Sequence, residues 1–199
     1  IMDIMFLSVS TGSGHIRAAE SVKNRIAQKY PGSRLIIIDA LKYINPVINK
    51  LIVGGYLNTV KKTPQIYRRL YNISETDKTV TDLSNKFNKL IAFKLKKLIN
   101  GFRPSIIVCT HPFPVQMLSN LKKKYFMEIP VVAILTDFVN HPFWMHDNID
   151  AYVVAHEYIK NDMINCGIPG EKIFPYGIPV SDIFLEKEDK IAILKKYGL

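Results

Sequence analysis

Short apolar runs separated by helical stretches constrain the fold of this chain more than any other feature. Six runs have the length of strands, at Ile4–Val9, Leu35–Asp39, Ile106–Cys109, Val131–Leu135, Ala151–Val154 and Lys172–Phe174. They are continuous rather than alternating, as expected when helices cover both faces of a parallel sheet. The sequence therefore predicts an α/β domain built on a Rossmann-like, doubly wound parallel sheet.

The interval 41–103 interrupts this alternation of strands and helices because it is too long for one crossover helix. It predicts an inserted basic, amphipathic helical segment, in which Thr81 caps the start of a second helix and Gly101 follows its end. The interval holds 13 Lys and Arg against 3 Asp and Glu, a net charge of +10, whereas the rest of the chain has 14 of each. Such a segment predicts an anionic partner: nucleic acid, acidic lipid or a phosphorylated substrate.

The basic segment has three interpretations. A solvated helix face is the usual outcome for a run of charges. No helix-turn-helix, RRM or zinc pattern supports a nucleic-acid surface, so no nucleic acid is expected. A membrane surface fits better, because aliphatic and tyrosine residues are mixed with Lys61, Lys62, Arg68 and Arg69. No apolar run is long enough to span a bilayer, and the two separated cysteines fit a reducing cytosol. We therefore expect a peripheral protein at the cytoplasmic face of the cell membrane.

Histidines gather where the predicted strands end. His15, His111, His141 and His156 each fall within a few residues of a strand end, and His146 follows close behind. In an open α/β sheet, ligands bind beyond the carboxyl ends of the strands. The clustering therefore predicts an active cleft along this edge of the sheet.

The turn after the first strand fits an anion site better than a dinucleotide site. Gly12 and Gly14 supply two glycines, but Arg17 occupies the third position of G-x-G-x-x-G and obstructs close helix packing. Asp39 would be the ribose ligand that keeps a nicotinamide enzyme open as an alternative. Otherwise the turn presents backbone N–H groups to an anion, and His15 beside it can take a proton from a hydroxyl. The structural alternative for His15 is a turn or capping role.

The stretch TDFVNHPFWMHD is the second region rich in functional side chains. Asp137, His141 and His146 do not have the spacing of a known zinc pattern, and Pro142 breaks any helix, so no metal is expected. We predict instead that the loop lines a pocket, with Trp144 giving apolar surface and Asp137 or His141 a polar handle. The alternative is a loop whose aromatic residues only cover the sheet edge.

Four motifs together point to a known family. STGSGHIRAAESV, VCTHPFPVQML, TDFVNHPFWMH and YGIPVSDIF, in this order and spacing, resemble the N-terminal domain of monogalactosyldiacylglycerol synthases and bacterial processive diacylglycerol glycosyltransferases. The resemblance implies one half of a GT-B fold, in which two Rossmann-like halves face each other across a cleft. It implies an N-terminal half that binds the lipid acceptor and the membrane, a C-terminal half that binds a UDP-sugar, and metal-independent transfer with inversion. No cofactor is expected beyond the UDP-sugar donor.

The same resemblance assigns roles to individual residues. His15 matches the histidine placed near the acceptor hydroxyl, which makes it the candidate general base. The resemblance implies an acceptor-binding role for Asp137, His141 and Trp144, and it matches Gly12 and Gly14 to a glycine turn near the donor diphosphate. From the residues themselves we expect His111, which a proline-stiffened loop presents, to join the acceptor side. We likewise expect Ser13 and Arg17 to belong to the diphosphate-facing turn.

These observations lead to one expected function and one alternative from another class. Residues 1–199 are expected to form the acceptor-binding domain of a membrane-associated enzyme that moves a hexosyl group from a UDP-sugar to diacylglycerol. The UDP-sugar-binding domain is expected to be absent from this chain, which would leave the fragment inactive alone. The alternative is a non-catalytic module that binds anionic lipid or nucleic acid.

Overall fold

The computed structural model describes residues 2–10, 13–44, 78–125, 127–139, 141–184 and 190–196, together with residue 198. Gly12 of the predicted diphosphate-facing turn lies outside these ranges. The predicted membrane-facing residues Lys61, Lys62, Arg68 and Arg69 also lie outside them.

Six parallel strands form one sheet in the order β2-β1-β3-β4-β5-β6. The strands are β1 (Asp3–Ser8), β2 (Arg34–Asp39), β3 (Ile106–Cys109), β4 (Val131–Ile134), β5 (Ala151–Val153) and β6 (Ile173–Phe174). All six predicted strands are confirmed, each to within one residue at either end. The prediction succeeded because a strand that is covered on both faces must be apolar throughout.

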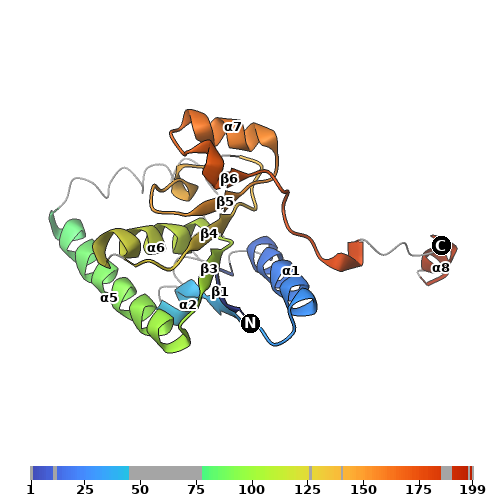
Figure 1. Ribbon diagram of the computed structural model, residues 1–199, viewed down its shortest axis with the longest axis horizontal. Coiled ribbons are helices and arrows are strands. Elements are labelled where there is room, and N and C mark those ends of the chain that lie inside the picture. The colour runs from blue at the N-terminus through green and yellow to red at the C-terminus, as the bar shows by residue number, and fades with distance from the viewer. Residues whose placement is uncertain are drawn as a thin grey trace.

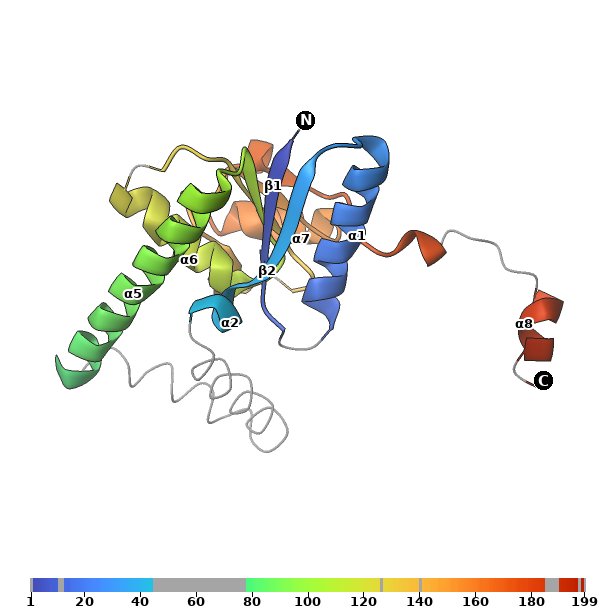
Figure 2. The ribbon, with the colours of Figure 1, turned by 90° about the horizontal axis from the view of Figure 1, so that it is seen from below.

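Helices lie on both faces of this sheet, whereas α8 (Lys190–Lys196) lies apart from it (Figure 1, Figure 2). The other helices are α1 (Gly14–Lys29), α2 (Ala40–Ile44), α5 (Lys78–Phe102), α6 (Pro112–Tyr125) and α7 (Glu157–Asn165). Short 3-10 turns cover Pro142–Trp144, Gly170–Lys172 and Asp182–Phe184. Both ribbon views place α1 on one side of the sheet and α5 with α6 on the other (Figure 1, Figure 2). The α/β, doubly wound architecture is therefore confirmed.

The core has two parts, one on each face of the sheet, as the alternation of side chains along a strand requires. Met5 and Leu7 of β1 belong to the larger cluster, which includes α5 and α6. Ile4 and Phe6, which alternate with them, pack with Ala19 of α1 in the smaller cluster. Each of these strand side chains is almost or fully buried, so the central strands are fixed from both sides.

The described part of the basic interval contains α2 and α5. Helix α5 packs through Ile91, Leu95 and Ile99, while Phe93 on another side of the helix is 68% exposed. The predicted helix ends were wrong, since Thr81 and Gly101 both lie inside α5. The helix ends instead at Phe102, and Arg103 after it takes the left-handed conformation (φ 54°) that glycine usually adopts. Pro104 follows directly and cannot continue a helix.

The order of the strands indicates which edge of the sheet is suited to bind a ligand. The strand order reverses direction between β1 and β3, which makes this the topological switch point of the sheet. Leu7 pairs with Cys109 and Ser8 with Asp39, so β1, β2 and β3 end at nearly the same level. The segments that follow these strands are therefore neighbours at the carboxyl edge, where open α/β sheets bind their ligands.

Candidate functional site

His15 lies in the first turn of α1, and its ring reaches the residues that follow β3 and β4. Its Nδ1 atom lies 2.8 Å from the backbone carbonyl oxygen of Thr110 and 2.7 Å from Oγ1 of Thr136. The side chain is half-buried, so one side of it still meets solvent. The structure thus brings together three segments that are far apart in the sequence.

These contacts decide which nitrogen of His15 carries the proton. A carbonyl oxygen can only accept a hydrogen bond, so Nδ1 must donate to Thr110. In the neutral ring Nε2 then has a lone pair and no hydrogen. His15 is therefore arranged as a proton acceptor through Nε2.

His111 lies edge-on to His15, with 4.5 Å between the ring centroids and 68° between the ring planes. Its Nδ1 accepts a hydrogen bond from the backbone N–H of Phe113 at 3.1 Å. Burial is the main cause that lowers the pKa of His111 to about 3, and the nearby His15 adds a smaller effect in the same direction. His111 is consequently neutral near pH 7 and adds no positive charge beside His15.

A buried pair of hydroxyl groups links the end of β1 to the residue that follows β3, next to His15. Thr110 Oγ1 donates to Ser8 Oγ at 2.9 Å, and both side chains are fully buried. The backbone N–H of Thr110 donates to the carbonyl of Leu7 at 3.2 Å. Hydrogen bonds from the side chain and from the backbone N–H of Thr110 thus hold this residue in place, and with it the carbonyl that accepts from His15.

The carboxylate of Asp39, at the end of β2, accepts hydrogen bonds from Ser10 and Lys42. Its Oδ2 accepts from the backbone N–H of Ser10 at 3.1 Å and from Ser10 Oγ at 2.5 Å, while Oδ1 accepts from the backbone N–H of Lys42 at 3.0 Å. Burial raises the pKa of Asp39, but these hydrogen bonds outweigh burial and hold the pKa below its ordinary value. The carboxylate therefore anchors the start of the turn before α1, which leaves it poorly suited to bind a ribose.

The described part of the turn is open to solvent. Ser13 is the N-cap residue of α1 and its side chain makes no capping hydrogen bond. A Cβ atom added to Gly14 would meet no atom within 4 Å, so packing within the chain does not require a glycine there. Ser13, Gly14 and Arg17 are all exposed. The first-turn N–H groups, which have no partner inside the helix, lie at this open surface.

The loop after β4 differs from the prediction in the position of Trp144. Its ring is fully buried, so it does not line an open pocket. The reason is that the indole packs in the core and its Nε1 donates to Oδ2 of Asp137 at 3.1 Å. Asp137 is half-buried and follows Thr136 directly, so Trp144 fixes the loop that also contacts His15.

Three of the histidines near strand ends accept hydrogen bonds from the backbone two residues further on. The bonds run to Nδ1 of His111 from Phe113, to Nδ1 of His141 from Phe143, and to Nδ1 of His156 from Tyr158. His141 and His156 are exposed and cap the turn or helix that follows them. The histidine clustering that predicted an active cleft is thus explained in part by capping.

Sequence reasoning missed Ser8, Ser10, Thr110 and Thr136. The available signal was a small hydroxyl residue at or just after the ends of β1, β3 and β4, where side chains at the carboxyl edge meet. Within the described ranges, no group of three or more His, Cys, Asp or Glu side chains could hold a metal ion. None of the helices in those ranges has the length and apolar character needed to cross a bilayer.

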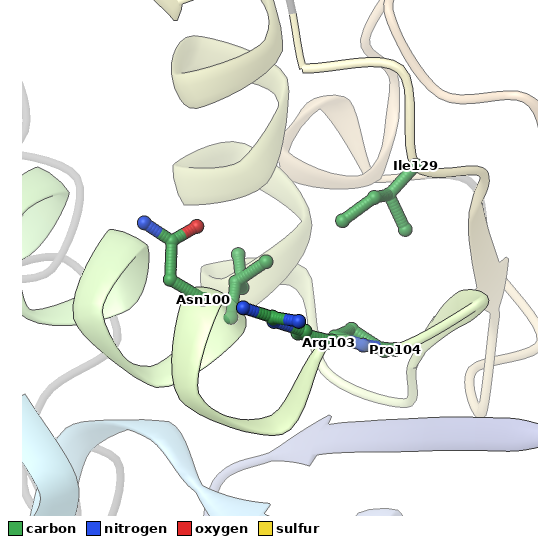
Figure 3. A pocket seen from close by; sticks show the side chains of 5 residues that line it. Asn100, Arg103, Pro104 and Ile129 are labelled. Carbon is green, nitrogen blue, oxygen red and sulfur yellow. The ribbon is translucent and has the colours of Figure 1, made fainter.

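A separate hollow has a volume of about 400 Å³, and Figure 3 shows side chains that line it. Its lining comes from the end of α5 and the segments before β3 and β4, with Ile99, Asn100, Arg103, Pro104 and Ile129. These segments precede the strands, so the hollow lies at the amino edge of the sheet, opposite His15.

Comparisons with known proteins show what the chain is similar to. Residues 15–180 match the model of the monogalactosyldiacylglycerol (MGDG) synthase family. The chain is 31% identical over 198 residues to the processive diacylglycerol beta-glucosyltransferase of Bacillus mycoides (strain KBAB4), covering 98% of this chain and 50% of that protein. The same identity holds over 199 residues for the enzyme of that name from Bacillus cereus (strain AH187), with the same coverage. The chain thus spans about half the length of the curated relatives that it matches.

A solved structure shares the fold at low sequence identity. The apo form of the lipopolysaccharide outer core galactosyltransferase WaaB superposes with a TM-score of 0.52 at 11% identity. The match covers 86% of this chain and 44% of that one. The six-stranded domain therefore corresponds in fold to one half of a GT-B glycosyltransferase.

Proposed function

The chain belongs to the MGDG synthase family, and we propose that it is the acceptor-binding half of an enzyme that moves a hexosyl group from a UDP-sugar to diacylglycerol. The relatives whose names state this chemistry are about twice as long as the chain. A second, C-terminal half would supply the UDP-sugar site. Residues 1–199 would supply the acceptor site, the general base and the membrane contact.

The observation that carries the proposal is the hydrogen bond from His15 Nδ1 to the Thr110 carbonyl. It leaves Nε2 as the basic nitrogen of a half-exposed ring at the switch point of the sheet. In the proposed step, Nε2 takes the proton of the acceptor hydroxyl while that oxygen attacks the anomeric carbon. The bond from this carbon to the diphosphate breaks, and its electron pair leaves with UDP.

The turn before α1 is the proposed contact for the leaving diphosphate. Its first-turn N–H groups and the positive end of the helix dipole favour an anion. Gly14 has open space above it, and Arg17 is exposed in the same turn. Preorganised donors of this kind stabilise charge that develops during a reaction. Ser13 and Gly12 complete the proposed turn.

The loop after β4 is the proposed acceptor side of the site. Asp137 is half-buried next to Thr136, and Phe138 and Val139 are 72% and 69% exposed directly after it. A carboxylate beside exposed apolar side chains suits a lipid alcohol, which presents a hydroxyl on an apolar body. His111 borders this region through its contact with His15, and exposed His141 lies in the same loop. Trp144 contributes through its bond to Asp137 rather than by direct contact.

The proposed partner of the basic interval is an anionic membrane surface at the cytoplasmic face of the cell membrane. In the described part of α5, Phe93, Lys96 and Lys97 are exposed close together in sequence. An aromatic residue among lysines is the composition expected at the interface of an acidic leaflet. Diacylglycerol is insoluble in water, so an enzyme that uses it must reach it at the bilayer.

Reconstitution of the full-length protein tests this function. It is incubated with vesicles that contain diacylglycerol and an acidic phospholipid, and with UDP-glucose or UDP-galactose. We expect a glycosyl diacylglycerol from at least one donor. Vesicle binding without any product from either donor would contradict the proposal and favour the non-catalytic lipid-binding module.

A further inference from the structure

His15 has two oxygen partners on one nitrogen, which is more than a simple tautomer lock requires. Nδ1 has one hydrogen, yet it lies 2.8 Å from the Thr110 carbonyl and 2.7 Å from Thr136 Oγ1. The hydrogen is therefore shared between two acceptors in a three-centre bond. Among the residues that the structure describes, no carboxylate is hydrogen-bonded to His15. The two threonine oxygens occupy the place where a carboxylate would orient a catalytic histidine.

We propose that Thr136 is a positioning residue, whose hydroxyl holds the Nδ1–H of His15 and so keeps Nε2 aimed at the acceptor hydroxyl. This inference rests on the proposed function for its catalytic meaning. When Nε2 takes a proton, the ring becomes a cation, and the hydrogen bonds from Nδ1–H become charge-assisted and stronger. Thr136 therefore stabilises the state that forms during sugar transfer more than the resting state.

One of the two oxygen atoms belongs to the backbone and the other to a side chain. A substitution can therefore remove only the oxygen of Thr136. The Thr110 carbonyl is backbone, and the bonds of Thr110 to Ser8 and Leu7 restrain it. Thr136 contributes a side chain from the loop that Trp144 fixes through Asp137. The position of the proposed acceptor loop and the orientation of the proposed base are thus coupled through one hydroxyl group.

Kinetics of the full-length protein test this role with two substitutions at one position. Thr136→Val keeps the shape of the side chain and removes the hydroxyl, whereas Thr136→Ser keeps the hydroxyl. We expect Thr136→Val to lower kcat by about 10- to 100-fold, with little change in KM for either substrate. We expect Thr136→Ser to stay within about threefold of wild type. Ser119→Ala, which removes a buried hydroxyl remote from the site, is the matched control and should leave kcat unchanged.

A second readout on the 199-residue chain does not depend on activity. Nitrogen NMR of the His15 ring reports the Nδ1–H group and how fast its hydrogen exchanges with water. Because the Thr110 carbonyl accepts from Nδ1 in every variant, we expect the Nδ1–H form in all of them. We expect this hydrogen to exchange several-fold faster in Thr136→Val than in wild type or Thr136→Ser, because one of its two acceptors is gone. Circular dichroism of each variant verifies that the chain is folded.

The outcomes separate this inference from the proposed function. If wild type transfers sugar and Thr136→Val keeps its kcat, or if Thr136→Ser is as impaired as Thr136→Val, the role of Thr136 is overturned while the function stands. If the full-length protein transfers no sugar, the proposed function fails and the NMR comparison alone decides. Equal Nδ1–H exchange rates in wild type and Thr136→Val then overturn the inference.

Discussion

At the scale of single residues, His15 differs from its neighbours in what its ring contacts. His111, His141 and His156 accept backbone N–H groups close in sequence, as capping residues do. The partners of His15 lie 95 and 121 residues away, on the ends of two other strands. A residue held by such distant partners is positioned by the whole sheet, which is the arrangement expected of a functional group.

Asp39 provides a test of how the turn before α1 is anchored. Asp39→Asn replaces one accepting oxygen with a donor group, so the bonds from Ser10 or Lys42 are lost. We expect the free energy of unfolding of the 199-residue chain at pH 7 to fall by about 1–3 kcal/mol in urea titrations. Asp182→Asn, which alters an exposed ion pair with Arg25, is the control and should change it little.

The same variant has a predicted pH dependence. The pKa of Asp39 is lowered in the folded chain, so its contribution is fully present above its ordinary value of 3.8 and is lost as the pH falls through the folded pKa. The difference in unfolding free energy between wild type and Asp39→Asn should therefore be constant near neutral pH and shrink below about pH 4. A difference that grows on acidification would contradict the assigned hydrogen bonds.

The partners of His15 and the burial of Trp144 could not be predicted from the sequence. A histidine at the start of a helix and hydroxyl residues after several strands were visible in the sequence. The contacts of His15 with Thr110 and Thr136 were not predictable, because nothing local relates residues so far apart. The burial of Trp144 was missed for a related reason. Its indole N–H finds Asp137 within the same loop, and this partner permits a core position that the polar surroundings of the sequence did not suggest.

At the scale of secondary-structure elements, helix α5 has one buried and one exposed side. Leu95 is fully buried against the sheet, and Phe93, two residues earlier, is 68% exposed. We expect Leu95→Ala to lower the free energy of unfolding of the chain by about 2–5 kcal/mol, because it leaves a cavity in the core. Phe93→Ala should change it by less than about 0.5 kcal/mol. Equal effects in chemical denaturation would show that α5 is packed differently.

Strands and helix ends were predictable where a single sequence pattern determines them. Continuous apolar runs predicted all six strands. Burial on both faces explains this for the central strands, because it leaves little freedom in their composition. The end of α5 was not predictable, because Arg103 takes a backbone conformation that the rule for helix ends reserves for glycine. The interval 45–77 lies outside the described residues, so its predicted membrane-facing lysines and arginines stay predictions.

At the scale of the whole molecule, the uneven charge predicts which surfaces bind membranes. The 199-residue chain should float with vesicles that contain acidic phospholipid more than with neutral vesicles, and salt should weaken this binding. The double variant Lys96→Glu and Lys97→Glu on α5 should reduce binding by about tenfold or more, since each basic residue near the surface contributes about 1 kcal/mol.

The matched control changes the net charge equally on the other face of the sheet. Lys23→Glu with Lys29→Glu lies on α1, which both ribbon views place opposite α5 (Figure 1, Figure 2). This variant should keep most of the vesicle binding. An equal loss in both double variants would mean that net charge alone, rather than the α5 surface, attracts the membrane.

The decisive experiment replaces His15 in the full-length protein. Steady-state transfer from the UDP-sugar to diacylglycerol in vesicles is measured for His15→Ala and for His156→Asn, which replaces an exposed capping histidine with another capping residue. We expect a loss of about 100-fold or more in kcat for His15→Ala and nearly normal turnover for His156→Asn. Turnover of His15→Ala within a few-fold of wild type would contradict the claim that this imidazole removes the acceptor proton.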